Sequence, residues 1–340
     1  MNIETILSQL ISENGISGEE FPASEKAAEI LKEYLDVHID SFGNVYGTVK
    51  DFDQNKKTLL LDAHIDEIGM IVTYITDEGF LKVSQCGGLD TRLLLAQEVD
   101  VLGKETVKGI VISTPPHLEK DSSKAPEMDE IYIDIGMSKE NAEKIVSLGD
   151  RVFINNSLAY LQNDCVTAKS LDDRSGIAVI IYCLDLLKDK KLKYNLKVLF
   201  SVQEEVGERG AKIGSYNIDA DMAIAVDVSF ARTKGESSDK CGEMAKGPMI
   251  GIAPSLSREL SDLLIKTAEK NHIPFQIEVM NGKTGTNADV IGISKNGIKT
   301  CTLSVPLKYM HTPVESVSIA DIENTGVLLS KFCELEDVQC

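Results

Sequence analysis

The beginning of the chain carries two kinds of apolar pattern. Apolar positions three and four residues apart predict helices over Ile3–Ser12 and Ser24–Leu35, with Ser24 as the N-terminal cap of the second. A continuous apolar run over Thr58–Asp62 predicts a strand buried on both faces. This run stops abruptly, and polar residues beginning with His64 follow it. The predicted strand therefore delivers polar side chains at its carboxyl end.

Between residues 68 and 163 the pattern changes to short β-like runs separated by glycines and by the pair Pro115-Pro116. Within this stretch only Lys139–Leu148 has helical spacing. Closely spaced short strands are typical of a small barrel or sandwich. We therefore expect a small all-β unit over residues 68–163, inserted into a larger domain.

Strands and helices alternate again after Ser170. This alternation is typical of an α/β domain, here with a mixed sheet, built from residues 1–67 and 164–340. The expected helices are Asp173–Leu187, Ser257–Asn271 and Ile319–Cys333, and the expected strands are Leu196–Val202, Met222–Val226 and Thr300–Val305.

Composition excludes several classes of partner. The 340 residues include 54 Asp and Glu against 35 Lys and Arg, a net charge of −19, which disfavours binding to nucleic acid or to an anionic membrane. The N-terminal stretch lacks the pattern of a signal peptide, and no apolar run approaches the roughly 20 residues of a membrane span. The 7 cysteines form no CxxC pair. We expect a cytoplasmic protein with reduced thiols and no cysteine-based zinc site.

Candidate chemistry lies just past the predicted strands and at one helix start. In open α/β sheets, sites form at the carboxyl ends of the strands. Only His, Asp and Glu side chains reach that edge, and imidazole with carboxylate is a ligand set for hard to borderline divalent metals. The candidates are His64, Asp66, Asp172, Asp173, Glu204, Glu205, Asp227 and His311.

Each candidate taken alone has an ordinary structural explanation. A single histidine after a strand is usually a packed or solvent-facing residue, and Asp172 and Asp173 are also suitable as a helix cap and a first-turn acid. Taken together, several acids at the ends of buried strands carry a high cost of unpaired charge. A bound cation removes that cost, so the set favours a metal site.

Six segments of the chain resemble the M42 family of metallo-aminopeptidases, the tetrahedral or TET peptidases, which include glutamyl and deblocking aminopeptidases and members labelled endoglucanase. The resemblance covers essentially the whole chain. The six segments are highly specific together, and HIDEIG (64–69) and QEEVGERGA (203–211) are the most specific singly. The segments are DAHIDEIG (62–69), SLDDRSG (170–176), SVQEEVGERGA (201–211), AVDVS (225–229), KGPMI (246–250) and VPLKYMHTPVE (305–315).

The resemblance implies a site with two divalent metal ions, zinc or cobalt first and manganese as a further option. Asp172 would bridge the two ions, because in related zinc peptidases the bridging acid stands four residues before a glycine, here Gly176. His64 and Asp227 would complete one site, and Glu205 and His311 the other. Glu204 would be the general base, and Asp66 would orient the imidazole of His64.

The implied fold is a phosphorylase/hydrolase-like zinc-peptidase domain with a PDZ-like or barrel insertion that dimerises subunits. Dimers would build homo-oligomers up to a hollow dodecamer that admits short peptides with a free N-terminus. One departure from the family pattern lies in TGTNAD (284–289), where Asn287 stands in place of a more usual Asp, in a loop implied near the substrate pocket.

The sequence predicts a metal-dependent aminopeptidase that uses metal-activated water. Another dinuclear amidohydrolase, such as an N-acyl amino acid deacylase or a carboxypeptidase, is the alternative within enzymes. A glucan-active protein is disfavoured by the absence of Trp and the 5% aromatic content. A catalytically silent scaffold is disfavoured by the complete ligand set.

Overall fold

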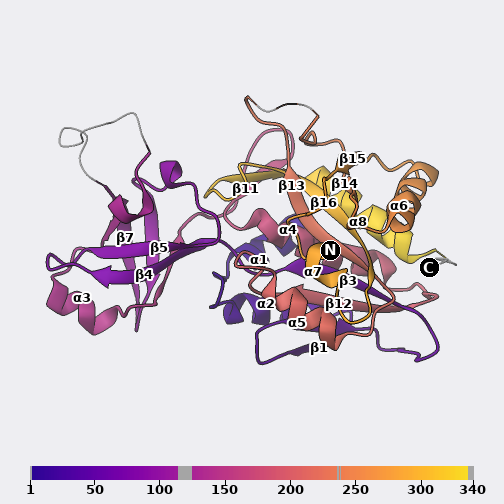
Figure 1. Cartoon of the computed structure of the whole chain (residues 1–340), viewed down its shortest axis with the longest axis horizontal. Helices are drawn as coiled ribbons and strands as arrows, with labels where there is room; N and C mark the ends of the chain where they lie inside the picture. The colour runs from indigo at the N-terminus through magenta and orange to yellow at the C-terminus, as the bar shows by residue number, and fades with distance from the viewer. Residues whose placement is uncertain (1, 114–124, 236, 238, 336–340) are drawn as a thin grey trace.

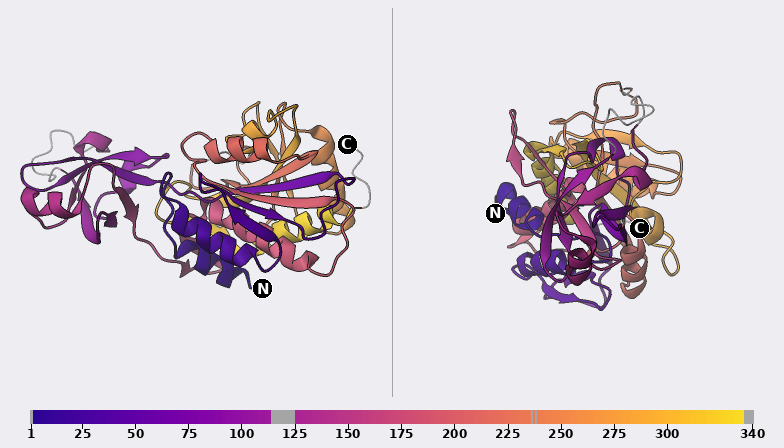
Figure 2. Two further views of the ribbon diagram at one scale, coloured as in Figure 1. Left: turned by 90° about the horizontal axis from the view of Figure 1, so that it is seen from below. Right: turned by 90° about the vertical axis from the view of Figure 1, so that its left-hand side faces the viewer.

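The chain forms a broad α/β body with a small β barrel beside it (Figure 1). This computed structural model describes residues 2–113, 125–235, 237 and 239–335. Figure 2 shows the barrel projecting from one end of the body, so that the molecule is elongated. Within the described ranges, every helix is too short or too polar to cross a membrane.

The body contains an eleven-stranded mixed sheet, which confirms the predicted α/β class. Its main path runs β1 (Asp36–Ile39), β2 (Val45–Thr48), β12 (Asn195–Ser201), β3 (Thr58–His64), β13 (Met222–Phe230), β16 (Lys299–Lys308), β17 (Glu315–Ser318), β11 (Cys165–Ala168) and β10 (Ala159–Tyr160). The strand β14 (Met249–Ile252) pairs with β16, and β15 (Gln276–Val279) pairs with β14.

The four central strands β12, β3, β13 and β16 are parallel, so their carboxyl ends meet at one edge of the sheet. The pairing of β13 with β3 ends at Ala225, whereas its pairing with β16 continues to Phe230. The expected end of this strand at Val226 is therefore wrong. Asp227 lies inside β13, in the part that extends beyond its contact with β3.

Helices cover both faces of the sheet (Figure 2). Because successive side chains of a strand point to opposite faces, Leu59 and Leu61 of β3 enter one core and Leu60 enters the other. The first core contains side chains of α1 (Ile3–Ile11), α2 (Phe21–Leu31), α4 (Leu171–Leu187), α6 (Arg258–Lys270) and α8 (Ile319–Cys333), and the second those of α5 (Arg209–Asn217) and α7 (Ala288–Ile291).

The barrel is closed and has a hydrophobic core of its own. Its strands, in order around the barrel, are β4 (Gly69–Ile75), β5 (Leu81–Cys86), β8 (Tyr132–Asp134), β7 (Thr106–Ile112), β6 (Glu98–Leu102) and β9 (Arg151–Ile154), accompanied by α3 (Lys139–Ile145) and the short 3-10 turns Thr91–Leu93 and Met128–Glu130. All six strands fall between residues 68 and 163. The chain has already rejoined the large sheet at β10, before residue 164.

Several helix boundaries differ from the sequence prediction; for example, the helix expected to end at Leu35 ends at Leu31. The helix expected from Ser24 begins at Phe21, because Pro22 is well suited to a first turn. Ser24 therefore lies inside α2, where its buried hydroxyl donates to the carbonyl of Gly43 instead of capping the helix. The helix expected over Lys139–Leu148 ends at Ile145.

Candidate active site

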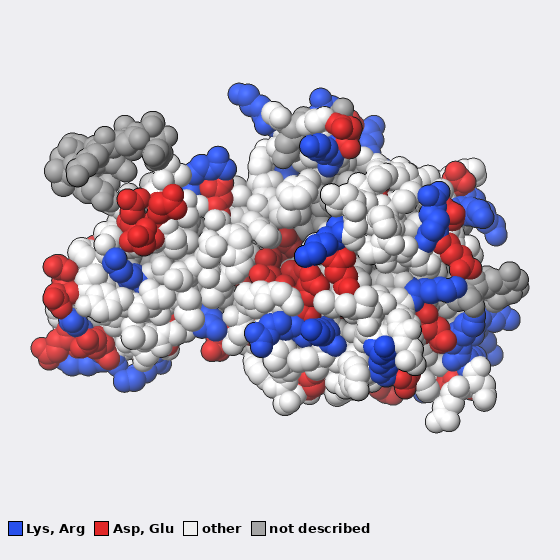
Figure 3. All heavy atoms as spheres, in the orientation of Figure 1, with Lys and Arg blue, Asp and Glu red and all other residues white. Residues whose placement is uncertain are grey.

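The residues proposed as metal ligands come from five separate segments and line one cavity of about 660 Å³. Figure 3 shows a hollow in the body, on the side near the barrel, with Asp and Glu side chains gathered in it. His64 ends β3, Asp172 begins α4, Glu204 and Glu205 follow β12, Asp227 lies in β13, and His311 follows β16. The parallel strands thus bring distant parts of the sequence to one place.

Asp172 lies between the two histidines. One carboxylate oxygen, Oδ1, is 3.0 Å from Nε2 of His64, and the other, Oδ2, is 3.6 Å from Nε2 of His311. Its side chain is only 7% exposed, so water does not screen these contacts well. A carboxylate with one oxygen toward each imidazole has the geometry that a bridge between two cations needs.

The second histidine has a carboxylate neighbour from a different segment. Nε2 of His311 lies 3.4 Å from Oε2 of Glu205. Together with Asp172, these side chains can direct one ligand atom each toward a shared point, because the three atoms lie within 4.8 Å of one another. This grouping matches the expected pairing of Glu205 with His311.

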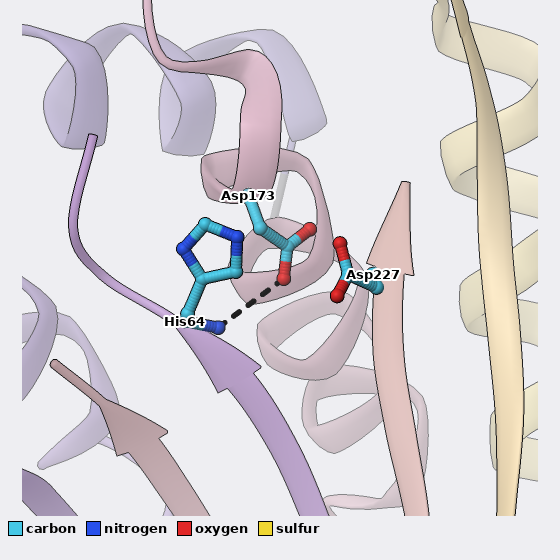
Figure 4. Close-up of side chains that lie close together, drawn as sticks. All are labelled: His64, Asp173 and Asp227. Atoms are coloured by element: carbon cyan, nitrogen blue, oxygen red, sulfur yellow. Dashed lines mark hydrogen bonds between the residues drawn. The ribbon is translucent and has the colours of Figure 1, made fainter. Parts of the chain in front are cut away.

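Around the first histidine the structure adds Asp173 to the expected residues. His64, Asp173 and Asp227 form a buried group in which the backbone N–H of His64 donates to Asp173 at 3.3 Å (Figure 4). The other oxygen of Asp173 accepts the backbone N–H of Gly176 at 2.9 Å. Both oxygens of Asp173 thus hold backbone groups, whereas those of Asp172 face the imidazoles.

Asp66 lies beside the imidazole of His64 and also contacts a second segment. Its backbone carbonyl is 3.1 Å from the Nδ1 atom of His64, and its carboxylate is 3.6 Å from the same atom. The carboxylate also accepts hydrogen bonds from the hydroxyl of Ser17 and from the backbone N–H groups of Glu204 and Glu205, at 2.6, 2.8 and 3.2 Å. Asp66 therefore fixes the two glutamates as well as the histidine.

The site concentrates negative charge out of water. Burial raises the pKa of the Asp227 carboxyl well above its usual range, with the charge of Asp172 adding to the effect. Burial, together with the charges of Glu205 and Asp172, raises the pKa of Glu204 to about 8. For His311, burial lowers the pKa but its bond to Glu205 outweighs this and raises it to about 9. The carboxylates therefore favour a positive charge among them.

The donor set fits divalent cations. In the ion pairs of the described residues, Asp172 and Glu205 have histidines as partners, not Lys or Arg. Oxygen and imidazole donors from His64, Asp172, Glu205, Asp227 and His311 suit zinc, cobalt or manganese, and metal binding would replace the protons that the site otherwise holds.

Glu315 is a functional candidate that the sequence reasoning did not single out. This buried first residue of β17 accepts the backbone N–H of Asp172 at 3.0 Å through Oε2 and that of His311 at 2.9 Å through Oε1. One carboxylate therefore holds the two segments that carry the bridging acid and the second histidine. Its sequence signals are its place four residues after His311 and at the end of the family-like segment 305–315.

We expect Glu315→Gln to weaken metal binding by about 10- to 100-fold, the usual cost of losing a partner that orients metal ligands. The amide offers one acceptor where the carboxylate offers two, so one backbone N–H loses its partner. Metal affinity is measured by calorimetric titration, and excess metal should restore most of the activity. Glu323→Gln, at an exposed position of α8, is the matched control. An unchanged metal affinity in Glu315→Gln would contradict this positioning role.

The barrel reaches the site through two glycines that follow β5. A β-carbon on Gly88 would lie 2.8 Å from Nδ1 of His311, and one on Gly87 would lie 3.2 Å from the β-carbon of Glu205. Gly87 also has a φ of +77°, which favours glycine. Residues without side chains are therefore needed where the barrel segment packs against these two ligands.

Asn287, the departure from the family pattern, lies beneath the cavity instead of in its wall. It is buried, and its amide donates to Oδ1 of Asp62 at 2.7 Å and to the hydroxyl of Ser201 at 2.8 Å. The neighbouring residues Thr284, Gly285 and Thr286 line the cavity. Asn287 therefore links α7 to β3 and β12, while the loop that precedes it lies at the cavity, where the resemblance placed it.

Comparison with known proteins identifies the family. A family model described as M42 glutamyl aminopeptidase matches residues 43–328. The chain belongs to the M42 peptidase family. It is an enzyme that hydrolyses peptide bonds, and the aminopeptidase activity expected from the resemblance agrees with this family.

Relatives and solved structures of this M42 peptidase cover nearly all of it. The lysyl aminopeptidase of Pyrococcus furiosus is 32% identical over 97% of this chain and 96% of its own, and the glutamyl aminopeptidase of Lactococcus lactis is 28% identical over 83% and 81%. The aminopeptidase of Desulfurococcus kamchatkensis has a TM-score of 0.92 at 34% identity, covering 98% of this chain and 94% of its own. The TET1 peptidase of Pyrococcus horikoshii, described as assembling into a tetrahedron or a large octahedral shell, has a TM-score of 0.86 at 33% identity over 98% and 99%.

Proposed function

We propose that this M42 peptidase removes N-terminal residues from short peptides and uses two divalent metal ions. The observation that carries the proposal is the position of Asp172, with one carboxylate oxygen toward His64 and the other toward His311. Asp172 would be shared by both ions, His64 and Asp227 would complete one site, and Glu205 and His311 the other. Zinc or cobalt suits these donors best, and manganese is a further option.

Two cations held there would polarise the scissile carbonyl and acidify a water molecule. Glu204 has the proton-transfer role in this proposal. It lines the same cavity, and its backbone N–H donates to Asp66, which holds its main chain in place. A carboxylate oxygen of Glu204 would accept the proton of the attacking water and pass it to the leaving amine.

The free α-amino group of the substrate is the other element of the proposal. The acidic lining of the cavity, which includes Asp227, Glu205 and Glu208, favours a protonated or metal-bound amine at the end of the substrate. This preference for a terminal amine would direct the enzyme to the N-termini of peptides. An N-acylated substrate would lack that charge, which is how the proposal differs from an N-acyl amino acid deacylase.

We also propose that the protein is cytoplasmic, that it has two domains and that its chains assemble into homo-oligomers. Residues 1–67 and 164–340 would form a catalytic domain of the phosphorylase/hydrolase-like zinc-peptidase type, and residues 68–163 an inserted dimerisation domain. The separate core of the barrel supports this division. Homo-oligomers from a dimer to a dodecamer are supported by the assembly described for TET1.

Removal and restoration of metal test the proposed function. We expect chelated enzyme to lose its activity on Leu-, Glu- and Lys-p-nitroanilide, and zinc, cobalt or manganese added singly to restore it. The panel also measures which side chain is preferred at the N-terminus. Matched peptides with free and acetylated N-termini form the control. Full activity after chelation, with metal analysis showing no bound ion, would exclude the two-metal proposal; preference for the acetylated peptide would indicate a deacylase.

A further inference from the structure

One wall of the active-site cavity is an edge strand, β15. Among the described strands it pairs only with β14. The backbone N–H groups of Gln276 and Met280 donate to the carbonyls of Pro248 and Ile252 on the β14 side. Because backbone groups of successive strand residues point to opposite sides, Ile277 and Val279 direct theirs away from β14. The structure gives these two backbone groups no hydrogen-bond partner among the described residues.

The side chains of the same two residues are unusually exposed for apolar residues of a strand. Ile277 is 43% exposed and Val279 is 77% exposed. An exposed apolar strand edge with unpaired backbone groups is prone to pair with another chain, and proteins normally protect such edges with charge, proline or a covering segment. The strand Gln276–Val279 has no lysine or proline, and its one charged residue, Glu278, is turned inward and accepts a hydrogen bond from the hydroxyl of Ser229.

The edge is continuous with the candidate catalytic residues. Ile277, Val279 and the intervening Glu278 line the same cavity as Glu204 and His311. A peptide whose N-terminus lies among the metal ligands must leave the site along a wall of this cavity. Extended peptides commonly bind by adding a strand to an exposed sheet edge, where main-chain hydrogen bonds give affinity for any sequence.

We propose that the free edge of β15 binds the backbone of the peptide substrate as an added β-strand. This rests on the proposed aminopeptidase function and extends it to the part of the substrate beyond the cleaved bond. The bound partner is an extended peptide main chain, whatever its side chains. The enzyme therefore favours peptides with several backbone amides beyond the scissile bond over single-residue substrates.

Substrate length and backbone methylation test the proposal on the wild-type enzyme. We expect kcat/KM to rise from Leu-Ala to Leu-Ala-Ala-Ala and then to level off. N-methylation of the amide at the third or the fourth residue removes one donor, and at one of these positions it should lower kcat/KM by about 5-fold, the usual value of one hydrogen bond. The methyl group leaves the scissile amide unchanged.

A substitution in the strand completes the test. Val279→Pro removes the outward N–H, which an edge strand tolerates, and Val279→Ala removes the side chain while keeping the N–H. We expect Val279→Pro to lower kcat/KM for Leu-Ala-Ala-Ala about 5-fold more than kcat/KM for Leu-p-nitroanilide. In the Val279→Ala control, the ratio of kcat/KM between the two substrates should match that of the wild type within about 2-fold.

The outcomes separate this proposal from the proposed function. Hydrolysis of Leu-p-nitroanilide, which has no backbone beyond the cleaved bond, reports the proposed function alone. Equal losses on Leu-p-nitroanilide and on the tetrapeptide in Val279→Pro would overturn the β15 proposal, since the strand would then act through folding. The β15 proposal would also be overturned if N-methylation had no effect on kcat/KM at either position. If Val279→Pro changed the oligomer size measured by light scattering but not the dependence of kcat/KM on peptide length, the edge would instead bind a second copy of the chain.

Discussion

Asp172→Asn should abolish nearly all peptidase activity and deplete both metal ions. The carboxylate directs one oxygen toward His64 and the other toward His311, so both proposed sites lose charge with a single substitution. Loss of a residue that only orients a metal ligand costs about 10- to 100-fold in metal affinity or activity. Loss of a ligand that both ions share should therefore cost more than 10²-fold. Metal analysis of the purified variant, with kcat on Leu-p-nitroanilide, measures both effects. Two bound ions per chain in Asp172→Asn would exclude the bridging assignment.

Stability of the metal-free protein separates Asp172 from its neighbour. Asp172→Asn relieves repulsion in a crowded acidic site but also removes a charged partner of His64 and His311, so its melting temperature without metal should stay close to that of the wild type. Asp173→Asn should lower it, because both Asp173 oxygens accept backbone N–H groups, from His64 and Gly176. Asp189→Asn, at an exposed position just after the same helix, is the matched control. If Asp172→Asn lowered the melting temperature more than Asp173→Asn did, the bridge would be assigned to Asp173.

The elements that carry the ligands were predictable because their signals are local in the sequence. The run Thr58–Asp62 contains three consecutive leucines, which indicated a strand buried on both faces, and the sheet places it at the centre. Polar residues after such strands must lie at the carboxyl edge of a parallel sheet. This rule brought His64 and Glu204 into one predicted site before any distance was known.

The supporting contacts were not predictable in the same way, because they join a side chain to backbone groups far away in the sequence. Glu315 holds the N–H groups of Asp172 and His311, and the carboxylate of Asp66 holds those of Glu204 and Glu205. Every residue except proline has a backbone N–H, so the sequence does not distinguish the one that a carboxylate will bind. Only the folded chain shows which carboxylate receives it.

Asn287 and β15 illustrate two further limits. A motif places Asn287 near the site but not in the wall, since the turn Thr284–Thr286 faces the cavity while Asn287 turns inward to Asp62. The strand β15 has an alternating pattern of polar and apolar residues, which is a strand signal, but it spans only 4 residues. The sequence cannot show that one edge of so short a strand stays unpaired beside the catalytic residues.

Glu204→Gln should keep both metal ions and lose turnover by about 10²–10⁴-fold, the usual contribution of general acid–base catalysis. The amide has nearly the same shape as the carboxylate, and the backbone N–H that donates to Asp66 is unchanged, so the segment should stay in place. The amide oxygen of the variant is too weakly basic to take a proton from the attacking water. Measured kcat should fall, while KM and bound metal stay near the wild-type values.

The adjacent glutamate supplies the contrast. Glu205 lies 3.4 Å from His311 and belongs to the ligand group with Asp172, so Glu205→Gln should chiefly weaken metal binding, and added metal should restore part of its activity. Glu208→Gln is a control from the same cavity wall outside the ligand groups, and its kcat should stay within a few-fold of the wild type. Added metal should not rescue Glu204→Gln.

The pH dependence of Glu204→Gln gives an independent check on its role. A general base acts only when deprotonated, so wild-type kcat should rise with pH through the pKa of that base, and burial with the neighbouring acids raises the pKa of Glu204. Replacing Glu204 removes this titrating group, so the residual activity should lose its acidic limb, whereas Glu205→Gln with excess metal should retain it. If Glu204→Gln keeps the acidic limb and loses its metal instead, the roles of the two glutamates are reversed, because the group that titrates in turnover must then be the neighbour.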